Sequence, residues 1–143
     1  MKTLVTTLAL IMSVAAQAET LKDCKEAHVG LTELMVPVTK YSRNFLNNKV
    51  QVYTIDQIEP ACCSIGLAIV IPDETAELVG LAKCFTVTHL NGVDIQKART
   101  ETDSSGRLLL VVPTSVYDGT GHGKPGKPLK LRIDLKTATV NRE

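Results

Sequence analysis

The sequence predicts an α+β domain in which an N-terminal amphipathic helix packs on a mainly antiparallel β-sheet, with disulfides reinforcing the fold. Apolar residues recur at steps of three and four over residues 20–35, which is the period of one helix face. From residue 50 onward the chain instead carries short β-branched runs separated by turn signals, which are typical of strands. Four cysteines, at positions 24, 62, 63 and 84, suit a chain that folds in an oxidising compartment.

The first 18 residues have the three parts of a secretory signal peptide. Lys2 supplies a positive start, Leu4–Ala16 is an apolar stretch too short to span a bilayer, and Ala16-Gln17-Ala18 is a small-x-small cleavage site. Removing 18 of the 143 residues leaves 125, which suits one domain rather than two. We therefore expect residues 19–143 to form a single exported domain, in a bacterial periplasm or outside the cell.

The predicted helix covers residues 20–35, and its apolar stripe consists of Leu21, Cys24, Ala27 or His28, Leu31, and Leu34 or Met35. Thr20, with Asp23 three residues later, approximates a capping box at the start of this helix. Pro37 ends or kinks the helix, because its ring would clash with a carbonyl one turn earlier. A second helical piece is predicted over residues 41–48, where an asparagine pair suits a helix exit.

Six segments predict strands: Val50–Ile58, Cys62–Ile71, Phe85–Leu90, Val93–Ala98, Arg107–Val112 and Leu129–Leu135. The Cys62–Ile71 run is apolar at odd and even positions, so we expect a central strand that is buried on both faces. Pro72-Asp73 predicts a turn that starts a short helix over residues 74–82. Asn91-Gly92 predicts a hairpin between its flanking strands. Apolar and charged residues alternate in Leu129–Leu135, so one face should contact the core and the other solvent.

Chain geometry limits how the four cysteines pair. In an extended strand Cys62 and Cys63 point to opposite faces, so a bond between them would need local distortion. We therefore expect one of them to bond Cys24 and the other to bond Cys84, with either assignment open. A bond to Cys84 places the starts of two strands side by side, which requires parallel strands unless the two lie in different sheets.

Two other roles for the cysteines are weaker. A redox role is disfavoured because the chain has no Cys-x-x-Cys motif. A metal site has one argument, since Cys24 and His28 would lie one helical turn apart, a sound spacing for two ligands. Two ligands do not make a site, so we predict structural disulfides and neither a metal nor another cofactor.

Residues 117–128 have the most unusual composition of the chain, with four glycines and two prolines. This composition excludes a helix and a central strand, and the spacing departs from that of a phosphate-binding loop. One interpretation is an exposed hairpin connection between the strands at 107–112 and 129–135. The other is a contact loop for a partner or a small anion. The candidate contact residues of that loop are Tyr117, His122, Lys124 and Lys127.

Charge and motifs narrow the function by exclusion. The chain has 16 basic and 15 acidic residues, and Lys2 is the only charged residue in the predicted signal, so the mature chain is neutral. This balance argues against nucleic-acid binding and against a membrane anchor, and no catalytic motif is present. We expect a non-enzymatic binding or interaction domain with a protein partner, such as an inhibitor, an immunity-type protein or an accessory subunit.

Two alternatives remain for the function. One is a metal-binding or thiol-dependent periplasmic enzyme or carrier that uses Cys24 and His28. The other is a structural subunit whose edge strand pairs with neighbouring molecules.

Overall fold

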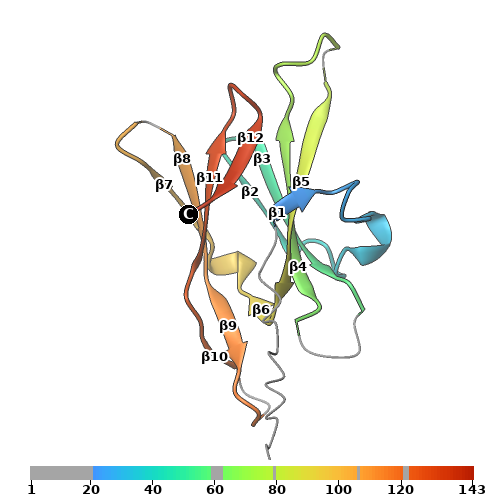
Figure 1. Cartoon of the computed structure of the whole chain (residues 1–143), viewed down its shortest axis with the longest axis vertical. Coiled ribbons are helices and arrows are strands. Elements are labelled where there is room, and N and C mark those ends of the chain that lie inside the picture. The colour runs from blue at the N-terminus through green and yellow to red at the C-terminus, as the bar shows by residue number, and fades with distance from the viewer. Residues whose placement is uncertain (1–20, 59–62, 79, 106, 121–122) are drawn as a thin grey trace, which may run out of the picture.

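The protein folds as a β-sandwich from which a hairpin projects (Figure 1). The computed structural model describes residues 21–58, 63–78, 80–105, 107–120 and 123–143. Strands make up 52% of the described residues and helical turns 5%, and these residues contain no helix of seven or more residues. The predicted α+β class is therefore wrong. The sheets themselves are antiparallel.

The strands form three antiparallel sheets, here called A, B and C. Sheet A has the order β1-β5-β4-β3-β2 and contains β1 (Leu21–Asp23), β2 (Ser42–Phe45), β3 (Val50–Asp56), β4 (Ile65–Pro72) and β5 (Ala82–Leu90). Sheet B has the order β10-β9-β6 and contains β6 (Gly92–Val93), β9 (Thr114–Tyr117) and β10 (Gly123–Pro125). Sheet C has the order β12-β11-β8-β7 and contains β7 (Arg99–Thr102), β8 (Leu108–Val112), β11 (Leu129–Asp134) and β12 (Thr139–Arg142). Two 3-10 helices are η1 (Leu31–Glu33) and η2 (Ile95–Lys97).

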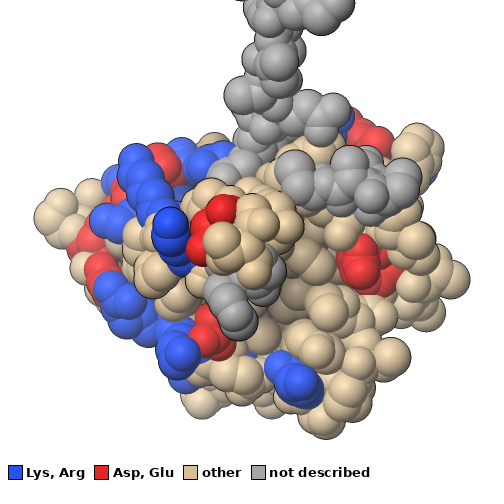
Figure 2. Space-filling model, turned by 90° about the horizontal axis from the view of Figure 1, so that it is seen from below, with Lys and Arg blue, Asp and Glu red and all other residues tan. Residues whose placement is uncertain are grey.

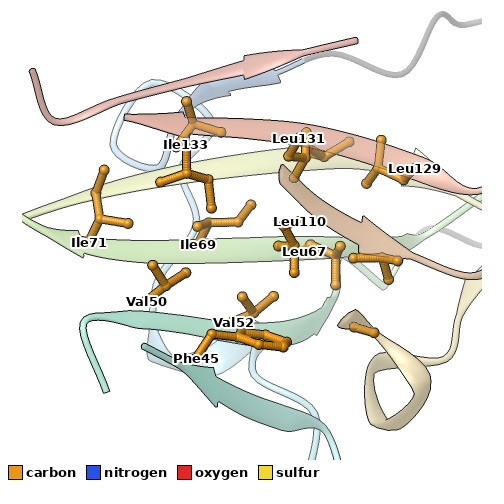
Figure 3. Close-up of a cluster of buried hydrophobic side chains, with 14 of the residues drawn as sticks. Phe45, Val50, Val52, Leu67, Ile69, Ile71, Leu110, Leu129, Leu131 and Ile133 are labelled. Atoms are coloured by element: carbon orange, nitrogen blue, oxygen red, sulfur yellow. The ribbon is translucent and has the colours of Figure 1, made fainter. Parts of the chain in front are cut away.

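Sheets A and C pack face to face and share one apolar core (Figure 3). Leu67 and Ile69 of β4 are fully buried there, together with Leu131 and Ile133 of β11. Each such side chain stabilises the fold by about 1.5–3 kcal/mol relative to leaving it exposed. The predicted facing of β11 is confirmed, because its apolar positions are buried while Lys130 is exposed.

The helix predicted over residues 20–35 does not form. Instead β1 pairs with β5, residues 24–28 turn, and η1 is the only helical piece of residues 21–35; position 20 lies outside the described residues. Two contacts hold this course: the Cys24 N–H donates to the Cys84 carbonyl at 3.0 Å, and a disulfide joins the two side chains. Pairing with β5 thus overrides a spacing that fits a helix.

The second helical piece, predicted over residues 41–48, is a β-hairpin. β2 and β3 pair antiparallel around a turn at residues 46–49. Asn47 and Asn48 have φ values of 53° and 67° there, a left-handed conformation that asparagine adopts more readily than most residues. The asparagine pair therefore closes a hairpin rather than ending a helix.

β4 lies at the centre of sheet A, as predicted for the apolar run at residues 62–71. Cys62 itself lies outside the described residues. β4 runs antiparallel to β5, and Val70 near the end of β4 lies opposite Cys84. The parallel arrangement inferred from the cysteines is therefore wrong.

Two local predictions between β4 and β7 also fail. The described part of residues 74–82 forms a turn that leads into β5, and the Asp73 carboxylate accepts from the Thr75 N–H at 3.1 Å without starting a helix. After Asn91, β6 pairs with β9 rather than with β5. The chain passes from sheet A towards sheet C at this point, so Asn91-Gly92 changes sheets instead of closing a hairpin.

Candidate functional site

Residues 113–128 are here called the arm, and the described parts of this segment, 113–120 and 123–128, extend beyond one end of the sandwich (Figure 1). β9 and β10 continue β8 and β11 past Pro113. Val112 pairs with Leu129, and Ser115 pairs with Pro125, so one strand has one residue more than the other between these two pairs. Such a bulge bends and twists a hairpin. The segment does connect the two predicted strands, and much of it is itself strand.

Close backbone packing holds the base of the arm. A Cβ atom at Gly92 would lie 2.5 Å from Ser115 Oγ, and one at Gly126 would lie 2.6 Å from Thr114 Oγ1, so no larger side chain fits without a shift. The Gly126 N–H donates to the Thr114 carbonyl at 2.8 Å, and the Thr114 hydroxyl donates to the Lys127 carbonyl at 2.8 Å. These glycines therefore permit a firmly paired hairpin.

The arm presents two large side chains to solvent. Val116 is 49% exposed and Tyr117 is 60% exposed. Lys124 lies opposite Val116 across the strand pair, and its ammonium is 3.9 Å from the Asp118 carboxylate. The predicted contact residues Tyr117 and Lys124 therefore occupy neighbouring positions of the strand pair but point to opposite faces, and Lys124 shares its face with Val116, an apolar residue that the sequence did not single out.

Asp118 starts the turn at the tip of the arm. Its carboxylate accepts hydrogen bonds from the Thr120 hydroxyl at 2.6 Å and from the Thr120 N–H at 2.9 Å. The Thr120 hydroxyl, followed by that N–H, lowers the pKa of the Asp118 carboxyl. Gly119 has a φ of 79°, which favours glycine. His122, another predicted contact residue, lies outside the described residues.

A groove of about 210 Å³ lies at the base of the arm, between β9, the β10–β11 connection and the end of β12. Its polar lining includes Asn91, Thr114, Ser115, Lys127, Lys130 and Arg142. Of these, the sequence singled out only Lys127 as a contact residue. Alternation along β11 did predict that Lys130 faces outward, but only strand pairing brings it to the same groove as Lys127.

Charged side chains are unevenly distributed around this end of the molecule. Seen from the arm end in Figure 2, Lys and Arg gather on the side of sheet C, interleaved with carboxylates, whereas the other side of the view is mostly uncharged apart from patches of Asp or Glu. Several cations of the described residues are paired with carboxylates, namely Lys97, Arg99, Arg107, Lys124 and Arg132. Among the described residues, no carboxylate lies within 4 Å of the Lys127 or Lys130 ammonium.

One disulfide joins Cys24 to Cys84, with Cα atoms 5.4 Å apart. The prediction that both residues form disulfides is confirmed, but the predicted bonds from each to the Cys62-Cys63 segment are wrong. The physical reason is the register of sheet A, in which β1 rather than the start of β4 lies beside Cys84. Cys63 Sγ lies 3.5 Å from Asn91 Oδ1.

The metal site suggested for Cys24 and His28 loses its thiolate, because the Cys24 sulfur is bonded to Cys84. His28 lies in an exposed turn with a φ of 53° and not on a helix face. Within the described ranges, no group of three or more His, Cys, Asp or Glu residues could hold a metal ion.

The disulfide is compatible with folding in an oxidising compartment. In the part of the chain that the structure describes, no helix has the length and apolar character needed to cross a membrane. No protein-family model, curated protein or solved structure matches this chain.

Proposed function

We propose that this protein is an exported, non-enzymatic binding module that contacts a protein partner through its arm. The exposure of Val116 and Tyr117 carries the proposal. These successive strand residues point to opposite faces of the hairpin, side chains of these types gain stability when they are buried, and the arm projects away from the core that could bury them. A partner surface would supply the missing burial.

The construction of the arm supports this role. Its base is fixed by pairing between β6, β9 and β10, so its strands are already arranged before a partner arrives. A prearranged element loses less conformational entropy on binding than a flexible loop does. Tyrosine is also enriched among the residues that dominate binding energy at protein interfaces. Export is supported by the Cys24–Cys84 disulfide and by the predicted signal peptide.

Site-specific photo-crosslinking in the native host tests the proposal. A benzophenone amino acid replaces Tyr117, and in a matched control it replaces Leu78, which is 69% exposed in the turn between β4 and β5. We expect a discrete cross-linked protein from position 117 and none from position 78. Adding Val116→Ser to the first variant should lower the yield. No product at position 117, or the same products from both positions, would contradict the proposal.

A further inference from the structure

The groove at the base of the arm has the chemistry of an anion site. Lys127, Lys130 and Arg142 line it together with the hydroxyl of Ser115. Ammonium and guanidinium groups form strong charge-assisted hydrogen bonds to carboxylates, and hydroxyl groups add neutral donors. The set is therefore suited to an acidic group.

The backbone holds both lysines at the groove. The Thr114 hydroxyl donates to the Lys127 carbonyl at 2.8 Å, and the Glu143 N–H donates to the Lys130 carbonyl at 3.1 Å. The Glu143 side chain also lines the groove, but the Arg132 guanidinium donates to its carboxylate. Both lysines thus line the groove, and no carboxylate in the described ranges lies within 4 Å of either ammonium.

The size of the groove limits what can enter. Its volume of about 210 Å³ is below the roughly 300–1,000 Å³ of sites for drug-sized molecules. Leu90 and Pro128 provide an apolar part of the lining, which suits the methylene groups of a short acid. An acidic side chain fits this description better than a nucleotide or a cofactor does.

We infer that the groove binds the carboxylate of an Asp or Glu side chain, supplied by the protein that the arm contacts. This inference rests on the proposed function. Val116 connects the two sites, because it is half exposed on the arm and also lines the groove. A partner segment that covers Val116 therefore lies within reach of Lys127 and Lys130.

NMR titration of the purified protein with a blocked tetraglutamate peptide tests the inference. Amide shifts should centre on Ser115, Lys127 and Lys130, and a tetraglutamine peptide should cause none. The affinity should fall about tenfold or more in Lys127→Gln/Lys130→Gln, and it should fall when salt is raised. The matched control Lys22→Gln/Lys136→Gln removes two charges from exposed positions outside the groove, and it should leave the affinity unchanged.

Three results would overturn the inference. They are shifts centred away from the groove, an equal loss of affinity in the control variant, and equally tight binding of free glutarate, which would reassign the groove to small carboxylates. The photo-crosslink at position 117 separates this inference from the proposed function. If the crosslink forms but tetraglutamate does not bind, only the inference about the groove is contradicted. If the peptide binds but no crosslink forms, the proposed function of the arm is contradicted.

Discussion

The outer faces of the two sheets are covered in different ways. On sheet A, Val29 and Leu34 from the segment before β2 pack on Ile55 and Ala68, which are 0% and 4% exposed. On sheet C, Val111 is only 1% exposed, and its cross-strand neighbours are charged. A distant chain segment covers the first face, whereas long charged side chains line the second.

The covering of sheet C depends on neighbouring strands. Arg99 and Lys130 lie opposite Val111 from either side, and the apolar stems of such side chains can cover an aliphatic residue while their charges stay in water. Asp103 adds a charge network beside them, with its carboxylate 2.9 Å from Arg107 Nε and 3.4 Å from Arg132 Nε. Cross-strand pairs thus suffice on sheet C, whereas sheet A depends on long-range chain placement and a covalent bond.

The largest expected effect is a difference in unfolding free energy between a substitution on the inner face of β11 and one on its outer face. Ile133→Asp would bury an unpaired charge in the shared core and should cost more than about 4 kcal/mol of unfolding free energy, or prevent folding. Arg132→Ser, one residue away on the outer face, should cost about 1 kcal/mol or less. Urea unfolding measures both. Similar costs for the two variants would show that the assigned facing is wrong.

Removing the disulfide should loosen the cover of sheet A. Cys24→Ser/Cys84→Ser should lower the unfolding free energy by about 2–4 kcal/mol, because the bond closes a separation of 60 residues. Amide hydrogen exchange should rise first at Met35, whose N–H donates to the Thr54 carbonyl.

Peptide mapping without reduction provides the control for the disulfide variant. It should recover Cys24 linked to Cys84, with neither linked to the Cys62-Cys63 segment. A peptide that joins that segment to Cys84 would contradict the register of sheet A.

A smaller loss of stability is expected for a substitution on the outer face of sheet C, where charged side chains cover Val111. Val111→Ala should lower stability by about 1.5 kcal/mol, at about 0.8 kcal/mol for each carbon removed from a buried position. Thermal or urea unfolding should show the loss without any change in the disulfide. Unchanged stability would mean that the charged stems do not cover this position.

The smallest effect concerns acid stability on sheet C. The backbone N–H of Arg107, aided by that of Ser105 and by the Arg107 guanidinium, lowers the pKa of the Asp103 carboxyl. A depressed folded pKa gives stability that is present above the unfolded value of about 3.9 and is lost as pH falls through the folded pKa. Asp103→Asn should therefore be less stable than the wild type at pH 7, and the difference should shrink towards pH 3. A constant difference would show that the charge is not involved.

Much of the strand pattern could be predicted from the sequence. β3, β4, β8 and β11 lie where β-branched or alternating runs predict them, since alternation reports which residues of a strand share a face. The helix predicted over residues 20–35 was wrong, because an apolar spacing of three to four residues also fits a short strand followed by a turn. The groove could not be predicted, because only the pairing of β11 with β12 brings Arg142 to the same groove as Lys127 and Lys130.

The sequence by itself determined the core face of β11, the hairpin connection that became the arm, and the participation of Cys24 and Cys84 in a disulfide. The tertiary structure decided which cysteines pair, which sheet β6 joins and what covers each outer face. The physical reason is that a local pattern reports the facing of a residue on its own strand. Which strand lies beside a given strand depends on contacts between distant segments of the chain. A different neighbouring strand would change which cysteines can pair and which side chains line the groove.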